Sequence, residues 1–192
     1  MIVIIEGKIN SGKTLLLAKL TKDRMQETER KVICSKDSRF NFECEEVEYC
    51  DFVSRLLSLQ DSGDFHDLIV PFDESYVYFD SRSSFIQKAN SLINLLISSK
   101  NVDIFLTTMH LDYIDKRLRR ARDYVISCKD GYEDGHIHFS SRDARDGTFY
   151  GTLPISEMIN NVRSGANTRS FTNDENFMSR SLGEYRSLGV IR

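Results

Sequence analysis

The sequence predicts an α/β fold in which helices flank a mostly parallel central sheet. Short β-branched runs, each long enough for one buried strand, alternate along the chain with amphipathic helical patterns. The first run leads directly into a glycine-rich loop and a helix, and two later runs end in polar residues. With 192 residues, of which 40% are hydrophobic, the chain can bury one sizeable core, so we expect a single domain.

The glycine-rich loop runs from Gly7 to Thr14 with the sequence GKINSGKT, which fits the phosphate-binding motif G-x-x-x-x-G-K-[ST]. It joins the apolar run 1–6 to a helical pattern over 13–29. A helix N-terminus offers unpaired N–H groups and a favourable dipole to an anion. We therefore expect nucleotide phosphates here, with Lys13 reaching the terminal phosphates and Thr14 meeting Mg²⁺. The expected nucleotide-binding residues of the loop are Gly7, Lys8, Asn10, Ser11, Gly12, Lys13 and Thr14.

A second motif is the run 67–74, DLIVPFDE, which ends in two adjacent carboxylates. A parallel strand delivers such carboxylates to the same sheet edge as the phosphate loop. Asp73 would support the magnesium ion there, and Glu74 would orient and deprotonate the attacking water. The alternative is an ordinary strand that ends in an exposed acidic turn. Pro71 cannot donate to a strand ladder, so we expect a local irregularity at that position.

A third motif is the run 102–108, VDIFLTT, which predicts a buried strand that ends in hydroxyl groups. An amphipathic helical pattern over 82–99 precedes it. A polar residue at the tip of such a strand can sense the terminal phosphate of a nucleotide. Thr107, Thr108 and His110 are the candidates, and the alternative for each is a capped turn or a structural histidine.

One basic cluster stands out in the chain, over 116–122, KRLRRAR. Apolar residues at helical spacing accompany the cluster and predict a helix docked on the core with its cations facing outward. These apolar residues are Leu111, Ile114, Leu118 and Ala121. Three interpretations stay open: an arginine that enters a neighbouring subunit's active site, a contact with nucleic-acid phosphates, or a solvated helix face paired with nearby aspartates.

Composition narrows the class of protein. A formal net charge of -3 argues against a generally basic nucleic-acid binder but leaves room for a local basic patch. No run is long enough to span a bilayer, and the first run is too short for a signal peptide. The cysteines, Cys34, Cys44, Cys50 and Cys128, show no C-x-x-C spacing. We expect them to be reduced thiols in a soluble, cytoplasmic protein.

The C-terminal third carries weaker patterns. The runs 136–139 and 148–153 predict an edge hairpin. From residue 160 onward the chain is rich in serine, asparagine, arginine and glycine, which is typical of a flexible tail or of a segment that orders against a partner. We therefore place a nucleotide-binding domain over 1–159 and a tail over 160–192.

Three stretches together resemble a small P-loop ATPase of the FtsK–HerA superfamily. They are GKINSGKT, LIVPFDESYVYFDSR and DIFLTTMHLDYIDKRLRRARDYVISC, in that order, and the resemblance covers residues 1–129. The chain is similar in particular to viral genome-packaging ATPases and to Zot-like phage morphogenesis proteins. In that family a glutamine usually follows the Thr-Thr pair, whereas this chain has Met109. The polar sensing role would then fall to Thr108 or His110, or the coupling of hydrolysis to movement would differ.

The resemblance implies a RecA-like core, with the strand of Ile104 between the phosphate-loop strand and the strand that carries Asp73. It also implies a ring, hexameric or similar, with ATP sites at subunit interfaces and double-stranded DNA moving through it. Lys13 and Glu74 would then be catalytic, and Arg119 or Arg120 would act from the neighbouring subunit. The implied cofactors are ATP and Mg²⁺, the latter held by Thr14 and Asp73. A capsid or membrane protein is an implied docking partner, and the setting would be the host cytoplasm or the virion.

Three functions follow from these patterns. The first is an ATP-hydrolysing DNA translocase that packages a viral genome, and the second is a Zot-like assembly ATPase without translocation. The third is a nucleotide kinase, which would need an acceptor pocket and usually a basic lid. The adjacent acidic pair at the end of a strand favours water as the acceptor and so favours hydrolysis over the kinase.

Overall fold

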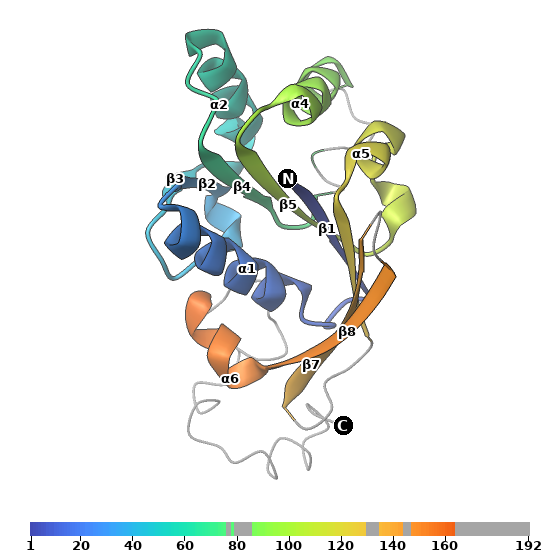
Figure 1. Ribbon diagram of the computed structural model, residues 1–192. Helices are drawn as coiled ribbons and strands as arrows, with labels where there is room; N and C mark the ends of the chain where they lie inside the picture. The colour runs from blue at the N-terminus through green and yellow to red at the C-terminus, as the bar shows by residue number, and fades with distance from the viewer. Residues whose placement is uncertain (76–77, 79–85, 130–134, 144–146, 164–192) are drawn as a thin grey trace.

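The computed structural model describes residues 1–75, 78, 86–129, 135–143 and 147–163. Its centre is an eight-stranded sheet in the order β3-β2-β4-β5-β1-β6-β7-β8 (Figure 1). The strands from β3 to β6 pair in parallel, and β7 and β8 add an antiparallel hairpin at one edge. The fold is therefore α/β, as the sequence predicts, with β5 between the phosphate-loop strand and the strand before Asp73.

The elements follow one another closely. The parallel strands are β1 (Ile2–Glu6), β2 (Lys31–Ser35), β3 (Glu45–Val47), β4 (Leu68–Phe72), β5 (Val102–Thr108) and β6 (Tyr124–Cys128). The hairpin is β7 (His136–Asp143) and β8 (Gly147–Pro154). The α-helices are α1 (Lys13–Thr28), α2 (Tyr49–Ser62), α4 (Ile86–Ser98), α5 (Lys116–Ala121) and α6 (Ile155–Met158). Short 3-10 helices are η1 (Lys36–Ser38), η2 (Leu111–Tyr113) and η3 (Ile159–Asn161).

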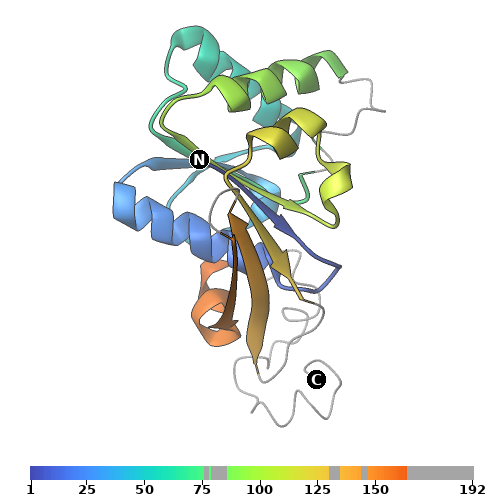
Figure 2. The same cartoon turned by 45° about the vertical axis from the view of Figure 1, so that its right-hand side comes forward.

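Helices cover both faces of the sheet, which explains why its central strands are mostly apolar on both sides. In β1, Val3 and Ile5 face the cluster built with α1 and α6, whereas Ile2 and Ile4 face the cluster built with α2, α4 and α5. Figure 2 shows α1 and α4 on opposite sides of the strands. Since successive side chains of a strand alternate between faces, one short run supplies both halves of the core.

Pro71 lies inside β4 without interrupting it. The strand stays in register with β5 from Leu68 to Phe72, so Pro71 is paired with Phe105. The ladder to β2 ends earlier, after Val32 pairs with Ile69. Proline has no N–H to donate, yet Pro71 keeps its place in the register with β5 and lies past the last residue of β4 that pairs with β2. The predicted irregularity is thus a shortened ladder and not a broken strand.

The basic segment differs from the single helix that its apolar spacing predicts. Leu111–Tyr113 forms η2, the chain then extends at Ile114, and α5 begins after Asp115. The side chain of Asp115 accepts a hydrogen bond from the backbone N–H of Arg117 (2.7 Å) and caps α5. The cap favours a fresh helix start over continuation, although Ile114 and Leu118 are still buried against the sheet as predicted.

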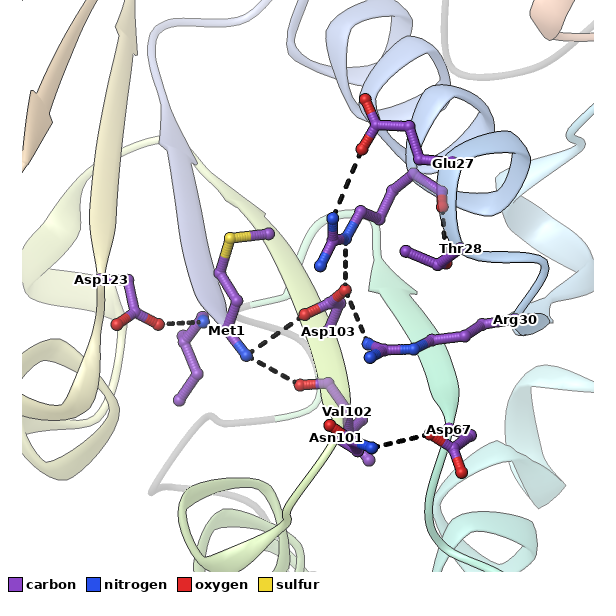
Figure 3. A network of polar contacts seen from close by, with 11 residues as sticks. Met1, Glu27, Thr28, Arg30, Asp67, Asn101, Val102, Asp103 and Asp123 are labelled. Atoms are coloured by element: carbon purple, nitrogen blue, oxygen red, sulfur yellow. Dashed lines mark hydrogen bonds and ion pairs between the residues drawn. The ribbon is translucent and has the colours of Figure 1, made fainter.

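The edge opposite the phosphate loop is closed by an ionic network around Asp103, the second residue of β5 (Figure 3). Its carboxylate accepts hydrogen bonds from Arg24 Nε (2.6 Å) and Arg30 Nη1 (3.0 Å). The α-ammonium of Met1 lies 3.3 Å from its other oxygen. Asp103 is only 2% exposed, so its charge needs these partners. The network ties the C-terminal end of α1 to the start of β5.

The predicted boundary at residue 159 remains a prediction, and residues 164–192 of the predicted tail lie outside the described residues. The described part does continue past the boundary: Arg163 N donates to Arg39 O (2.7 Å) and Asn41 N donates to Asn161 O (2.8 Å). Residues 160–163 therefore rest on the loop between β2 and β3. Among the described residues no helix is long and apolar enough to cross a membrane.

Candidate active site

The phosphate loop connects β1 to α1 at the C-terminal edge of the parallel strands. Gly7 is indispensable there because a Cβ would lie 2.5 Å from Ser11 Oγ and 2.9 Å from Cys128 O. Gly12 and Asn10 adopt left-handed backbone conformations, with φ of 87° and 63°. Asparagine tolerates that conformation better than most residues. The loop thus turns sharply at these two residues, the kind of backbone bend with which anion-binding loops are built.

Lys13 is the first residue of α1, and its side chain folds back over the loop. Its Nζ donates to the carbonyl oxygen of Lys8 (2.7 Å). Burial lowers the pKa of Lys13, while the nearby Cys128, Asp73 and Glu74 act in the opposite direction. A phosphate group would give this half-desolvated ammonium a stronger partner than a neutral carbonyl.

Asp73 follows β4 directly and meets the phosphate loop at Thr14. Thr14 Oγ1 lies 3.0 Å from Asp73 Oδ2 and 3.2 Å from Asp73 Oδ1. Burial raises the pKa of Asp73, against hydrogen bonds from Thr107, Thr14 and the backbone of Glu74. A hydroxyl and a carboxylate side by side are hard oxygen donors, the kind that Mg²⁺ prefers beside substrate phosphates. The donor set therefore fits the expected ion.

Thr107, near the end of β5, holds the Asp73–Glu74 turn in place. Its Oγ1 donates to Asp73 Oδ1 (2.7 Å) and accepts from the backbone N–H of Glu74 (2.8 Å). Its carbonyl oxygen accepts from both the backbone N–H (2.9 Å) and the hydroxyl (2.6 Å) of Ser75. One residue thereby fixes the carboxylate beside Thr14 and the backbone of the next acidic residue.

Glu74 has an exposed side chain and a left-handed backbone, with φ of 50°. A non-glycine residue in that region is uncommon and is held by its surroundings. Here the N–H of Glu74 donates to Thr107 Oγ1 (2.8 Å) and Asp73 Oδ1 (3.2 Å), and these hydrogen bonds stabilise the left-handed backbone conformation. The backbone of Glu74 is therefore fixed beside Asp73, and its carboxylate is open to solvent and near enough to Lys13 to oppose the lowering of that lysine's pKa by burial.

Thr108 and His110, the other candidates for sensing phosphate, lie differently. Thr108 is buried, and its hydroxyl donates to the backbone oxygen of His110 (3.0 Å). The ring of His110 accepts a hydrogen bond at Nδ1 from the N–H of Asp112 (3.3 Å). Because neighbouring side chains of a strand face opposite sides, only one of the two threonines can face Asp73. The structure places Thr107 there.

A basic pocket of about 490 Å³ lies on the α5 side of this edge. Four cations line it together with carboxylates, an apolar side chain and His110. The lining residues are Glu6, His110, Leu111, Asp112, Lys116, Arg119, Arg120 and Arg122. Glu6, the residue before Gly7, accepts from Ser127 Oγ (2.7 Å) and from the N–H of Leu111 (3.3 Å). The pocket therefore reaches Glu6, the residue that directly precedes the phosphate loop.

The two predicted trans-acting arginines both line this pocket. Arg119 Nη1 is held by Asp112 Oδ1 (2.7 Å), and its buried Nε has no hydrogen-bond partner among the residues that the structure describes. Arg120 is exposed. Within one chain, then, Arg119 pairs with Asp112. The cation that lies over the phosphate loop of the same chain is Lys13.

Sequence reasoning placed the phosphate loop and the acidic pair but did not choose between the polar residues at the tip of β5. Thr107 and Thr108 are chemically identical, and the choice depends on which face of β5 meets Asp73. The register between β4 and β5, which pairs Phe72 with Leu106, decides it. Glu6 was not singled out, although a carboxylate at the last position of an otherwise apolar strand is a signal of the same kind as Asp73.

Comparison with solved structures identifies the fold. The N-terminal domain of zonular occludens toxin from Neisseria meningitidis matches with a TM-score of 0.57 and 16% identity over 84% of this chain and 98% of that one. The genome packaging NTPase B204 from Sulfolobus turreted icosahedral virus 2, in complex with ATP-gammaS, matches with a TM-score of 0.56 and 14% identity over 80% and 97%. The RadB recombinase matches with a TM-score of 0.55 and 15% identity over 82% and 88%.

These likenesses define the class of protein: the chain has the RecA-like fold of P-loop NTPases. No family model matches the sequence, and no curated protein matches it. The fold agrees with the expected class, and its further placement in the FtsK–HerA superfamily remains a resemblance carried by the three motifs.

Proposed function

We propose that this chain hydrolyses ATP with Mg²⁺ at the edge where the phosphate loop meets Asp73 and Glu74. The observation that carries the proposal is the contact of Thr14 Oγ1 with both carboxylate oxygens of Asp73 (3.0 and 3.2 Å), with Glu74 held beside them. It joins a phosphate-binding loop to a group that can bind a metal ion and to a free carboxylate. All three are needed for phosphoryl transfer to water.

In the proposed reaction the loop N–H groups and Lys13 hold the β- and γ-phosphates. Bound Mg²⁺ would supply positive charge to the phosphate oxygens. Thr14 and Asp73 would hold that ion, and the carboxylate of Glu74 would accept a proton from a water molecule. As the water oxygen bonds to the γ-phosphorus, the bond to the ADP oxygen breaks, and ADP and phosphate leave. Thr107 keeps Asp73 and Glu74 in place throughout.

We further propose that the site is completed in a homo-oligomeric ring and that hydrolysis moves double-stranded DNA, as in genome packaging. The DNA assignment rests on the motif resemblance, and a neighbour named as a genome packaging NTPase supports it. Arg119 and Arg120 both line the basic pocket, and among the described residues the buried Nε of Arg119 has no hydrogen-bond partner. Both features suit a role toward another subunit. A Zot-like assembly ATPase without translocation is the second candidate, supported by the likeness to zonular occludens toxin.

Replacing Glu74 by glutamine tests the hydrolysis step. Glu74→Gln keeps the size and the backbone hydrogen bonds but removes the base, so we expect turnover to fall by roughly 10²- to 10⁴-fold. Nucleotide affinity should stay within a few-fold of the wild type, because Lys13 and the loop are intact. Steady-state phosphate release and binding of a fluorescent ATP analogue measure the two effects.

Lys13→Ala is the matched control, because it should lose nucleotide binding as well as turnover. Unchanged turnover in Glu74→Gln would show that this residue is not the base. Adding double-stranded DNA to the wild-type assay separates the two candidate functions. Stimulated hydrolysis supports the translocase, and hydrolysis that DNA leaves unchanged supports the assembly ATPase.

A further inference from the structure

Cys34 and Cys44 face each other beside the loop that follows β2. Their sulfur atoms are 3.1 Å apart, and the Cys34 thiol donates to Cys44 Sγ. Cys34 is fully buried at the end of β2, and Cys44 is half-buried just before β3. Ordinary disulfides have a sulfur separation of about 2 Å, so a shift of about 1 Å would bring these thiols to bonding distance.

The environment makes the two thiols unequal. Cys44 lines a pocket of about 460 Å³ between the end of α1 and the start of β3, which gives a small oxidant a route to its sulfur. The hydrogen bond from Cys34 lowers the pKa of the Cys44 thiol, while the same bond and burial raise the pKa of Cys34. Cys44 is therefore the better nucleophile of the pair, and Cys34 lies where it can resolve the product.

The loop enclosed by this pair supports the last described residues of the chain. Phe40 is fully buried and forms an antiparallel bridge with Val162. Arg39 O accepts from the N–H of Arg163 (2.7 Å), and the N–H and side chain of Asn41 donate to residues 161 and 160 (2.8 and 3.1 Å). Whatever fixes residues 35–43 also fixes the place where residues 160–163 lie.

We propose that Cys34 and Cys44 are a site of reversible oxidation, where a disulfide locks this loop and with it the docking of residues 160–163. The oxidant is a small-molecule disulfide such as glutathione disulfide. The Cys44 thiolate attacks one of its sulfurs, forms a mixed disulfide and releases a glutathione thiolate. Cys34 then loses its proton to solvent and attacks Cys44 Sγ, which forms the protein disulfide and releases the second glutathione thiolate. The protein loses two electrons, and the oxidant gains them.

The experiment uses the full chain with Cys50→Ser, because Cys50 is exposed and shares a tryptic peptide with Cys44. Lys36 and Arg39 lie between Cys34 and Cys44, so trypsin separates the two cysteines unless a disulfide joins their peptides. After treatment with glutathione disulfide we expect the joined peptides in a monomeric chain. We also expect a rise of about 5 °C or more in the unfolding midpoint, which dithiothreitol reverses, because the crosslink restricts the unfolded chain.

Two further variants in the same background make the result decisive. Cys44→Ser should show neither crosslink nor shift, and Cys34→Ser should stop at a glutathione adduct on Cys44. If Cys34→Ser does not fold, Cys44→Ser alone serves as the control. A chain with Cys34 and Cys44 intact that stays reduced, keeps glutathione on Cys44, or joins other cysteines overturns the proposal. None of these readouts depends on ATP hydrolysis.

Discussion

At the scale of single residues, Thr107 is the most informative side chain of the candidate site. It is fully buried, and its hydroxyl connects Asp73 Oδ1 (2.7 Å) with the N–H of Glu74 (2.8 Å). A hydrogen bond to an ionised group is worth about 1.5–3 kcal/mol, enough to hold a carboxylate in one orientation. Thr107 is therefore a positioning residue for the proposed reaction.

Thr107→Val removes the hydroxyl and keeps the shape. We expect turnover to fall roughly 10- to 100-fold, which corresponds to the loss of one charge-assisted hydrogen bond, with a small change in nucleotide affinity. Phosphate release and analogue binding give the two values, and Thr107→Ser should recover much of the rate because it restores the hydroxyl.

Thr108→Val is the matched control on the same strand. Its hydroxyl donates to the backbone oxygen of His110 (3.0 Å) and not to the acidic pair, which Thr107 holds, so the rate should change far less than in Thr107→Val. Equal losses in the two variants would mean that the hydroxyl near Asp73 has no special role. A larger loss in Thr108→Val would return the sensing role to Thr108, one of the candidates that the sequence left open.

At the scale of elements, β5 links the two edges of the sheet. Asp103 at its start belongs to the ionic network of Figure 3, and Thr107 near its end belongs to the candidate site. The four-residue separation puts the two groups at opposite ends of a buried strand. Stability and chemistry should therefore respond separately to changes at the two ends.

Asp103→Asn tests that separation. The change leaves Arg24, Arg30 and the Met1 ammonium facing a neutral group, and we expect a loss of about 2–4 kcal/mol in the free energy of unfolding. This loss in the free energy of unfolding is small for the removal of one partner from a buried ion pair, because both arginines are partly exposed and water can solvate them. Urea unfolding followed by circular dichroism measures it.

The control is Asp67→Asn, at an exposed carboxylate of the same edge that bonds Asn101 (2.9 Å). It should change stability much less than Asp103→Asn. ATP-analogue affinity should be nearly unchanged in both variants while they remain folded. A binding defect in folded Asp103→Asn would show that the two ends of β5 are coupled.

The strands and helices could be predicted because the spacing of apolar residues within each segment is enough to indicate its type. The apolar run of β4 and the helical spacing of α1 need no information from distant residues. The split between η2 and α5 was missed since the apolar spacing from Leu111 to Leu118 continues through it, and the cap at Asp115 outweighs that spacing. The Asp103 network was missed because its partners lie 73 to 102 residues away in sequence. Only the folded topology brings such residues together.

At the scale of the whole molecule, the phosphate loop and the arginines lie at the same edge of the sheet but in two different groups of residues. Lys13, Thr14 and Asp73 form the candidate ATP site, and Arg119 and Arg120 line the basic pocket beside Glu6. Arg119 is tied to Asp112 (2.7 Å), so it must leave that ion pair before it can reach a phosphate of another copy. A head-to-tail ring would supply such a copy at every interface.

Mixing two inactive variants tests whether Arg119 acts across an interface. The proposed site takes Glu74 from one subunit and Arg119 from its neighbour. The Arg119→Ala variant still has Glu74, and the Glu74→Gln variant still has Arg119. An interface is therefore complete when the first variant supplies Glu74 and the second supplies Arg119. In an equal mixture about a quarter of the interfaces have that order, and we expect ATP turnover to recover toward about a quarter of the wild-type rate. The same mixture with Arg120→Ala decides between the two arginines. Mixing Glu74→Gln with Lys13→Ala should recover nothing, because both defects lie on the same side of every interface. Failure of both arginine mixtures, with assembly verified by mass measurement, would place the arginines outside the reaction and leave the basic pocket to another anion.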